Sequence, residues 1–490
     1  MELPNSWSVI GLSDICKIET GKWDANHATD NGKYRFYTCA YDFFFCDTKR
    51  FSGECLILAG NGANVGEVFF YNGEFDAYQR TYVINEISVL PKYLYYHFLW
   101  NWKRLNSDKQ YGSATNYIRI GNFTDYNVFV SPLQEQHRIV TKIEELFSEL
   151  DKGIESLKTA QQQLKIYRQS LLKHAFSGKL TEQWRAENQD KIETADALLA
   201  RIQIEREQRY QELLTNWEDN GRQGTKPKAP KVMPPLTDEE LAELSELPDG
   251  WGWEKLIHFA DLIGGVTKGK NLDGKEKISI PYLRVANVQD GYLNLNEIKY
   301  IDVEIQDREK YALNFGDVLY TEGGDKDKLG RGAVWKNQID FCIHQNHIFR
   351  ARIFDKLIDS EILSFYSQTE NAKKYFFRHA KQTTNLASIN LTVLANLPVV
   401  ICSEYEQQQI LLEIESRLSI VDQLENTITT ALQQSEILRQ SILKKAFSGQ
   451  LVDQDPNDEP ASILLERIKA EKAALINPIT KKTKSGKKTV

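Results

Sequence analysis

The chain has 490 residues, of which 41% are hydrophobic and 11% aromatic, so two to four folded domains are expected. Its net charge of −7 excludes a protein that binds nucleic acid through overall basicity, and any such binding must come from local clusters of Lys and Arg. The sequence contains no run of about 18 apolar residues and no signal-peptide pattern at its start, so we expect a cytoplasmic protein with no membrane contact.

The first predicted element is a mixed domain of strands and helix over residues 1–131. Aromatic and β-branched residues concentrate in short runs, which is typical of strands. A longer amphipathic run then predicts a helix. The predicted strands cover 34–45, 55–60, 67–71 and 80–84, and the predicted helix covers 91–106.

A long helix dominates the next region, residues 132–215. Pro132 precedes it, and Gly178 follows as a left-handed C-terminal cap. A strict seven-residue apolar period predicts a coiled-coil seam on a rod on the order of 65 Å long. Gly153 interrupts the companion line, which predicts either close approach of another helix or a kink. The seam residues are Ile143, Leu150, Leu157, Leu164 and Leu171, with Leu146, Ala160 and Tyr167 on the companion line.

The remainder of the chain repeats this order. A Gly-, Pro- and Lys-rich linker covers 216–245, and a second mixed domain covers 246–402, with predicted strands in 281–288, 317–321, 332–335 and 346–352 and a helix over 360–376. A second helical region covers 403–475, and a basic, disordered tail covers 476–490. Its seam residues are Ile414, Val421, Ile428 and Ile442, with Leu424, Ala431 and Leu438 on the companion line.

Direct repeats connect the two halves. RQSLLKHAFSGKL at 168–180 and RQSILKKAFSGQL at 439–451 are identical at ten of thirteen positions, and LPNSW at 3–7 matches LPDGW at 247–251. The helical regions match well and the mixed domains diverge. The fold class is therefore α+β: two mixed domains, separated by a pair of long antiparallel coiled-coil helices, in an internal pseudo-two-fold repeat.

Catalytic motifs are missing from the sequence. GGVTKGKN at 264–271 resembles a phosphate-binding loop, but Asn271 replaces the Ser or Thr that would bind magnesium. His344 and His347 lack the spacing of a zinc site, and satisfied polar strand residues explain them better. We find no adenosylmethionine loop, methyltransferase signature or nuclease cluster. The chain is expected to be non-catalytic and to carry no cofactor or metal of its own.

The whole arrangement resembles the specificity subunit of type I restriction–modification systems. The diagnostic segments are SPLQEQHRIVTKIEELF, YRQSLLKHAFSGKLTEQWR, ASILLERIKAEK and the paired LP-x-x-W openings, and the resemblance covers nearly the full chain. It implies that each mixed domain is a target recognition domain that reads one half of a split, asymmetric duplex DNA sequence. It also implies that the helices set the unread spacing between the halves.

The resemblance further implies partner proteins. Two modification (methyltransferase) subunits carrying S-adenosylmethionine would dock on the helices, and two restriction subunits would add ATP- and Mg-dependent translocation and cleavage. Neither recognition domain is basic overall, because residues 1–131 hold 12 basic and 14 acidic side chains and residues 247–402 hold 20 of each. Binding to DNA must then come from clustered faces and from the partners.

Candidate DNA contacts are polar or basic groups in loops that occur in both repeats. Arg and Asn are the preferred candidates for base contacts, because Arg can form two hydrogen bonds with a guanine edge and Asn two with an adenine edge. The plain alternative is a solvated loop residue or a turn-forming Asn. The candidates are Lys22, Arg35, Asn61, Asn64, Arg80, Asn116, Arg119, Lys268, Lys270, Arg284, Asn287, Lys326, Lys328, Arg331, Asn346 and Asn385.

Two other functions compete with DNA recognition. A self-sufficient methyltransferase or nuclease would bind adenosylmethionine or cut DNA alone, which the missing motifs oppose. A coiled-coil scaffold that binds only proteins would show no sequence-dependent affinity for duplex DNA, even with all partners present.

Overall fold

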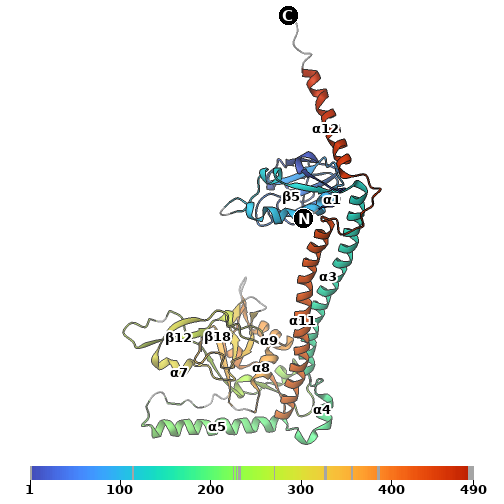
Figure 1. Cartoon of the computed structure of the whole chain (residues 1–490). Helices are drawn as coiled ribbons and strands as arrows, with labels where there is room; N and C mark the ends of the chain where they lie inside the picture. Colours follow the sequence, from blue (N-terminus) through green and yellow to red (C-terminus); the bar gives the residue numbers. More distant parts are fainter. Residues whose placement is uncertain are drawn as a thin grey trace. The chain divides into compact units, whose positions relative to one another are not determined.

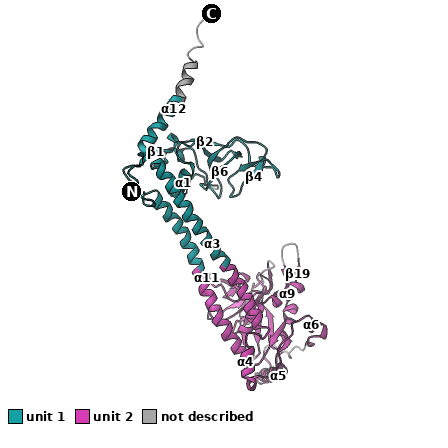
Figure 2. Ribbon diagram, turned by 90° about the vertical axis from the view of Figure 1, so that its right-hand side faces the viewer, with its two compact units in different colours: residues 1–159, 428–490 teal, residues 160–427 magenta. Residues whose placement is uncertain are grey.

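A computed structural model of the chain describes residues 3–112, 115–223, 226–227, 229, 233–269, 271–324, 328–354, 357–382 and 387–483, and Figure 1 labels its elements. The chain divides into two compact units. Unit 1 comprises Met1–Thr159 and Ile428–Val490, and unit 2 comprises Ala160–Thr427 (Figure 2). Each unit therefore contains one of the two mixed domains together with parts of both long helices.

Unit 1 contains two small sheets and a strand pair. The four-stranded antiparallel sheet has the order β2-β8-β5-β6, and the three-stranded sheet has the order β4-β3-β7, with β3 and β7 parallel. Strands β1 and β9 pair separately. The bounds are β1 (Ser8–Gly11), β2 (Lys17–Thr20), β3 (Tyr34–Tyr37), β4 (Phe44–Cys46), β5 (Glu54–Ala59), β6 (Val68–Asn72), β7 (Phe75–Ala77), β8 (Thr81–Asn85) and β9 (Asn127–Val130).

Helix α1 (Pro91–Asn106) of unit 1 confirms the predicted helix. Pro91 occupies its first turn, where a missing backbone N–H costs nothing. Leu94, Phe98 and Trp102 lie four residues apart on its buried face and join the core that covers β1, β5 and β9. A short helix α2 (Gly121–Thr124) leads into β9.

Unit 2 repeats the topology of unit 1. Its four-stranded sheet has the order β11-β18-β14-β16, and a three-stranded sheet, β13-β12-β17, again has one parallel pair. Strands β10 and β21 pair, and the short strands β15, β20 and β19 form a further sheet. The bounds are β10 (Gly252–Lys255), β11 (Ala260–Gly264), β12 (Lys277–Leu283), β13 (Lys299–Glu304), β14 (Val318–Thr321), β15 (Gly323–Gly324), β16 (Gly332–Val334), β17 (Ile343–His344), β18 (Ile348–Ile353), β19 (Lys381–Gln382), β20 (Ala387–Ser388) and β21 (Pro398–Ile401).

The single helix predicted over 360–376 is two helices, α8 (Ser360–Ser367) and α9 (Glu370–His379). Thr369 separates them, because its side chain accepts a hydrogen bond from the Ala372 N–H and so caps a new helix. The unit also holds α4 (Glu182–Glu187), α6 (Asp238–Ala242), α7 (Arg308–Tyr311) and α10 (Leu391–Ala395).

The two predicted long helices are α3 (Leu133–Ala175) and α11 (Glu404–Ala446), each of 43 residues. Gly178 and Gly449 follow the ends of these helices with φ of 73° and 72°, which confirms the predicted left-handed C-terminal caps. Helix α3 continues through Gly153, where an added Cβ would meet nothing within 4 Å, so close approach of another helix does not explain this glycine.

Within each unit the two long helices pack antiparallel, which confirms the predicted pairing. In unit 1 the start of α3, with Ile139 and Ile143, shares a core with Ile442 and Leu443 at the end of α11. In unit 2 Phe176, just after the end of α3, shares a core with the start of α11, through Ile410 and Ile414. Cross-helix ion pairs join Arg439 to Asp151 and Arg168 to Asp422 and Glu425.

The predicted seam is buried mainly on one line of residues. Ile143, Leu171, Ile414, Val421, Ile428 and Ile442 are buried, and Leu150, Leu157 and Leu164 are half-buried. The prediction that the companion line is buried is wrong at three positions, because the side chains of Tyr167, Leu424 and Leu438 are exposed. A two-helix pair covers a narrow stripe, and side chains at the edge of that stripe remain in solvent.

The helices that follow α3 and α11 pack on the opposite repeat. Helix α5 (Ala195–Asp219) places Leu198 and Ile202 in the core of unit 2. Helix α12 (Ala461–Thr483) places Leu465 and Ile468 in the core of unit 1. Helix α12 extends into the segment 476–490 that we predicted as a tail, and residues 484–490 lie outside the described residues.

Replacing Gly449 with Ala should lower the free energy of unfolding by about 1–3 kcal/mol, because a side chain would be forced into the left-handed region. Its Cβ would also lie 2.3 Å from Pro4 Cγ. Urea unfolding followed by circular dichroism measures the loss. Gly153→Ala is the matched control and should raise the stability by up to about 1 kcal/mol, since Ala is favoured in an open helix position. Equal effects of the two variants would show that the left-handed backbone at Gly449 does not require a glycine.

Candidate nucleic-acid interface

Several loops of unit 1 leave its four-stranded sheet at the same end. The antiparallel register pairs Thr20 with Tyr82, Ala59 with Thr81 and Leu58 with Val68. The connections after β2, between β5 and β6, and before β8 must therefore meet at that end. We call this set of loops the unit 1 loop end; it comprises residues 21–24, 60–67, 78–80 and, by the bonds described next, 111–112 and 115–120.

Backbone hydrogen bonds join the unit 1 loop end. Gly62 N–H donates to Asn116 O at 2.9 Å, and Ile118 N–H donates to Gly60 O at 2.9 Å. Gln79 N–H donates to Trp23 O at 2.8 Å. Six of the seven candidates predicted in this domain belong to these loops: Lys22, Asn61, Asn64, Arg80, Asn116 and Arg119.

The candidate side chains at this end differ in availability. Lys22, Arg80 and Asn116 are exposed. Arg119 is exposed as well, but it donates to Tyr117 Oη at 2.8 Å and lies over the Tyr111 ring at 4.3 Å. Asn61 and Asn64 are half-buried, and the Asn64 amide donates to Cys39 O at 3.0 Å. Asn64 therefore positions the loops, and Lys22, Arg80 and Asn116 can reach a ligand directly.

Unit 2 has an equivalent loop end. The register pairs Gly264 with Phe349 and Thr321 with Ile348, so the loops after β11 and β14 meet the loop before β18. Asn346 N–H donates to Val266 O at 2.9 Å, which joins two of these loops. The unit 2 loop end (265–269, 322–324, 328–331 and 345–347) holds four candidates: Lys268, Lys328, Arg331 and Asn346. Candidates Lys270, Lys326 and Asn385 lie outside the described residues.

Three candidates have structural roles. Asn287 is 3% exposed and bonds the loop between β12 and β13, accepting from Arg284 N–H at 2.8 Å and donating to Asn294 O at 2.8 Å. Arg284 forms an ion pair with Glu297 at 3.2 Å. Arg35 of β3 lies over the ring of Phe43, just before β4, and over the ring of Tyr71 in β6, outside the unit 1 loop end. We withdraw Asn287 as a DNA contact, since a buried amide with its bonds made inside the protein cannot read a base.

Arg331 is half-buried at the unit 2 loop end. Its Nη1 donates to Gln289 Oε1 at 2.9 Å, and its backbone N–H donates to Thr321 Oγ1 at 3.1 Å. These contacts hold the guanidinium in one place, and a guanidinium held in place needs less ordering before it binds a base or phosphate.

His344, the last residue of β17, and His347 of the unit 2 loop end differ in burial. His344 is fully buried, and burial lowers its pKa to about 4, so the ring is neutral at physiological pH. His347 is exposed and bonds to Glu322. No group of three or more His, Cys, Asp or Glu residues that could hold a metal ion occurs among the described residues. In the same part of the chain, no helix is long and apolar enough to cross a membrane.

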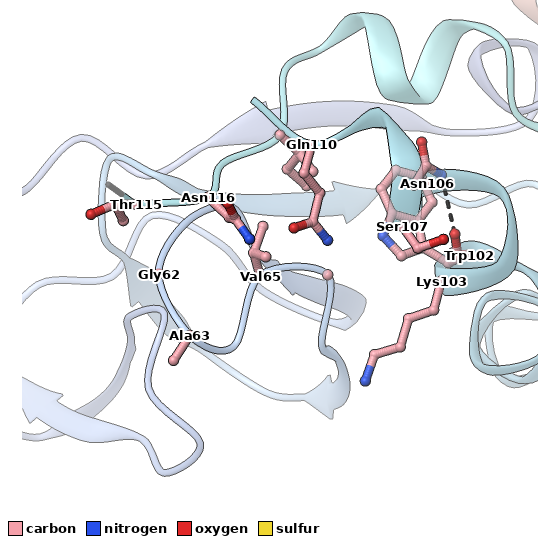
Figure 3. A pocket seen from close by; sticks show the side chains of 12 residues that line it. Gly62, Ala63, Val65, Trp102, Lys103, Asn106, Ser107, Gln110, Thr115 and Asn116 are labelled. Atoms are coloured by element: carbon pink, nitrogen blue, oxygen red, sulfur yellow. Dashed lines mark hydrogen bonds between the residues drawn. The ribbon is translucent and has the colours of Figure 1, made fainter. Parts of the chain in front are cut away.

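A cavity of about 660 Å³ opens beside the unit 1 loop end (Figure 3). The side chains of Lys103, Gln110 and Asn116 surround it in the close-up, and Trp102 and Val65 supply apolar wall. The described residues that line it include no Asp or Glu. The buried Trp102 indole N–H makes no hydrogen bond with any described residue. The Lys103 ammonium is paired with Glu67, and the amide and hydroxyl groups of the lining both donate and accept, so the cavity suits a polar ligand.

We did not predict Gln110 and Thr115 of this cavity from the sequence. A signal for Thr115 was present, because TNYIRI at 115–120 is matched by TNLASI at 384–389, whereas Gln110 lies outside this match. The exposed aromatic residues Tyr41, Phe43, Phe44 and Phe45 were also missed, because we predicted the whole stretch 34–45 as one strand. Three consecutive phenylalanines in a strand cannot all face one core, and this pattern could have revealed them.

Comparison with known proteins identifies the family. The model of the type I restriction modification DNA specificity domain matches residues 4–164 and 248–435, which is most of the chain and falls once in each repeat. The chain belongs to this family. The predicted resemblance is thereby confirmed, as is the role in DNA sequence specificity, and the protein-only scaffold is not favoured.

Named relatives agree with this family. The specificity subunit of the type I restriction enzyme EcoDI from Escherichia coli is 27% identical over 96% of this chain and 97% of its own length. The EcoKI specificity subunit from Escherichia coli K12 is 25% identical over 74% of this chain and 68% of its own. A solved structure, described as the structural basis of complex assembly and conformational transition of the type I R-M system, has a TM-score of 0.62 at 16% identity, covering 92% of this chain and all of its own. That likeness supports the fold.

Replacing Asn287 with Ala should lower the free energy of unfolding by about 1–3 kcal/mol, because the Arg284 N–H and the Asn294 and Glu297 carbonyls would lose their partner. Asn346→Ala is the matched control at the unit 2 loop end and should change stability by no more than about 0.5 kcal/mol. Urea unfolding compares the two. A stable Asn287→Ala protein with altered DNA preference would restore Asn287 as a candidate DNA contact.

Proposed function

We propose that the loop end of each unit reads one half of a split, asymmetric duplex DNA target. The observation that carries this proposal is that two sheets of the same topology gather equivalent loops that hold different residues. Equivalent scaffolds would present two readers to DNA in the same manner, while different loop residues would select different bases.

Each loop end carries side chains suited to DNA. The exposed cations Lys22 and Arg80 of unit 1 can neutralise phosphates, which fix register without reading sequence. Asn116 in unit 1 and Arg331 and Asn346 in unit 2 can make paired hydrogen bonds to base edges in the major groove. The polar cavity beside Asn116 offers further hydrogen-bonding groups.

We propose that α3 and α11 set the number of unread base pairs between the two halves. Both helices have 43 residues, and each contributes to both units. An antiparallel pair braced by cross-helix ion pairs resists bending, so its length would determine the distance between readers, which must match the pitch of B-DNA.

We also propose that two modification subunits dock on the helical region, one per repeat. Supporting this, each helix exposes an apolar pair at the same repeat position, Ile166–Tyr167 in α3 and Ile437–Leu438 in α11, with exposed fractions of 42–69%. Equivalent apolar pairs would give two equal contacts. Two restriction subunits would complete the complex in the prokaryotic cytoplasm, and the adenosylmethionine, ATP and Mg would be bound by these partners.

Arg331→Ala should weaken binding of the target by about 1–3 kcal/mol and relax preference at one position of the half-site that unit 2 reads, since a bidentate base contact would be lost. Methylome sequencing of the host first identifies the split target. Affinity of the assembled complex for that duplex and its single-base variants is then measured at fixed salt. Arg80→Ala is the comparison and should weaken all sequences about equally. Unchanged affinity and preference for Arg331→Ala would remove it as a reader.

Inserting one heptad into both α3 and α11, at levels that face each other, should lengthen the recognised spacer while leaving both half-sites unchanged. Seven residues add about 10 Å of helix, which corresponds to at most about three base pairs. Methylome sequencing of cells that carry the altered subunit with its partners reads the new spacer. A heptad inserted into α11 alone is the control and should impair folding through lost register. An unchanged spacer with the paired insertion would exclude the helices as the ruler.

A further inference from the structure

Unit 1 exposes a group of adjacent aromatic side chains on the β3–β4 hairpin. Tyr41, Phe43, Phe44 and Phe45 are 67%, 37%, 46% and 42% exposed. Isolated exposed apolar residues are common, but a contiguous set marks a contact surface. Figure 2 shows β4 at the edge of unit 1 away from its helices. We call residues 41–45 the aromatic hairpin.

The aromatic hairpin is apolar on both of its faces. Phe43 and Phe45 meet edge to face with centroids 5.5 Å apart, so they share one face. Strand alternation directs Phe44 to the other face. A flat protein interface would cover only one of these faces. A thin element with exposed rings on both sides is suited to insertion between two surfaces.

The hairpin is braced for such a role. The Arg35 guanidinium lies over the Phe43 ring at 4.1 Å and over the Tyr71 ring at 4.5 Å. Tyr41 meets Phe69 of β6 edge to face, with centroids 6.1 Å apart. These contacts fix the rings before any partner arrives, so little side-chain entropy remains to be lost on binding.

The hairpin is also continuous with the unit 1 loop end. The Asn64 amide donates to Cys39 O at 3.0 Å, and the Cys39 thiol lies 3.6 Å from Arg80 O. The Arg35 guanidinium puts cationic charge against the Phe43 ring, and the exposed Arg80 belongs to the loop that contacts Cys39, with Asp42 as the acidic side chain within the hairpin. Apolar rings flanked by arginines match duplex DNA, in which stacked bases lie between phosphates.

We propose that the aromatic hairpin inserts into the half-site read by unit 1 and unstacks a base step. This inference rests on the proposed function. Inserted apolar side chains separate neighbouring bases at an energetic cost that new contacts offset. Unstacking is also part of the work of extruding a base before its modification, so insertion would assist a partner methyltransferase.

The proposal predicts that the two half-sites are distorted differently. The corresponding hairpin of unit 2, β12–β13, exposes Tyr292 and Tyr300, which are separated in the chain. It has no run of adjacent exposed rings between residues 284 and 299, all of which are described. Unstacking by inserted rings, as distinct from extrusion of the base to be modified, should therefore occur at the half-site of unit 1 alone.

The test uses the full chain assembled with its modification subunits and target duplexes that carry 2-aminopurine at single positions. The fluorescence of 2-aminopurine rises when it unstacks. For the unaltered complex we expect a rise in the half-site of unit 1 at one step that does not contain the base to be modified. Phe44→Ala should abolish this rise and weaken binding about 5- to 150-fold, the loss typical of one base–aromatic stack. Phe315→Ala, a 71% exposed aromatic before β14, is the matched control and should change neither.

Each contrary outcome is distinct. The absence of a rise at every position other than the bases to be modified would overturn the insertion, as would a rise that persists in Phe44→Ala. Loss of the modification subunits from the Phe44→Ala complex would also overturn it, because the hairpin would then be a protein contact. If Phe44→Ala loses stability, Phe44→Gln keeps much of the side-chain volume without an apolar wedge and should still abolish the rise. Absence of any sequence-dependent binding by the unaltered complex would instead contradict the proposed function itself.

Discussion

A buried carboxylate at the start of each long helix forms hydrogen bonds with segments that are far apart in the sequence. Trp7 Nε1 donates to Glu135 at 3.0 Å, and Trp251 Nε1 donates to Glu406 at 2.8 Å. A buried carboxylate is costly unless its hydrogen bonds are made, and burial raises the pKa of Glu135 accordingly. Gln454 also bonds Glu135, while Arg185 and Thr181 bond Glu406. Segments far apart in sequence must therefore meet at each glutamate.

Much of the fold could be predicted because the sequence contains an internal repeat, so each element is indicated by two copies. The seven-residue period from Ile143 to Leu171 and the terminal Gly178 were sufficient for a long capped helix and its antiparallel partner. The break at Thr369 was not predicted, because it depends on a single side chain capping a backbone N–H. The exposure of Tyr167 and Leu438 was not predicted either. The seven-residue apolar repeat does not determine how many side chains on either side of the seam the partner helix covers.

The interface was predicted less completely. Loop sequences identified Arg80 and Asn116, and the sheet register gathers them at one end. Asn287 was included on the same grounds, because an asparagine in a turn looks identical in sequence whether its amide faces solvent or is buried. Gln110 was not predicted because its place in the cavity depends on how two loops pack. The exposure of Phe43 and Phe44 was missed although the run of three phenylalanines signals it, because the whole stretch was assigned to one strand.

The packing of α12 on the first domain has a consequence for synthesis on the ribosome. Leu465 and Ile468 complete a core whose other members, such as Leu12 and Leu56, emerge first. Residues 160–427 of unit 2 form a continuous stretch and can fold as soon as they have been translated. The earliest residues must instead wait, partly uncovered, until almost the last codon is read. Nascent chains of this protein are thus vulnerable to aggregation and proteolysis at their beginning, and a late frameshift would damage the domain encoded first.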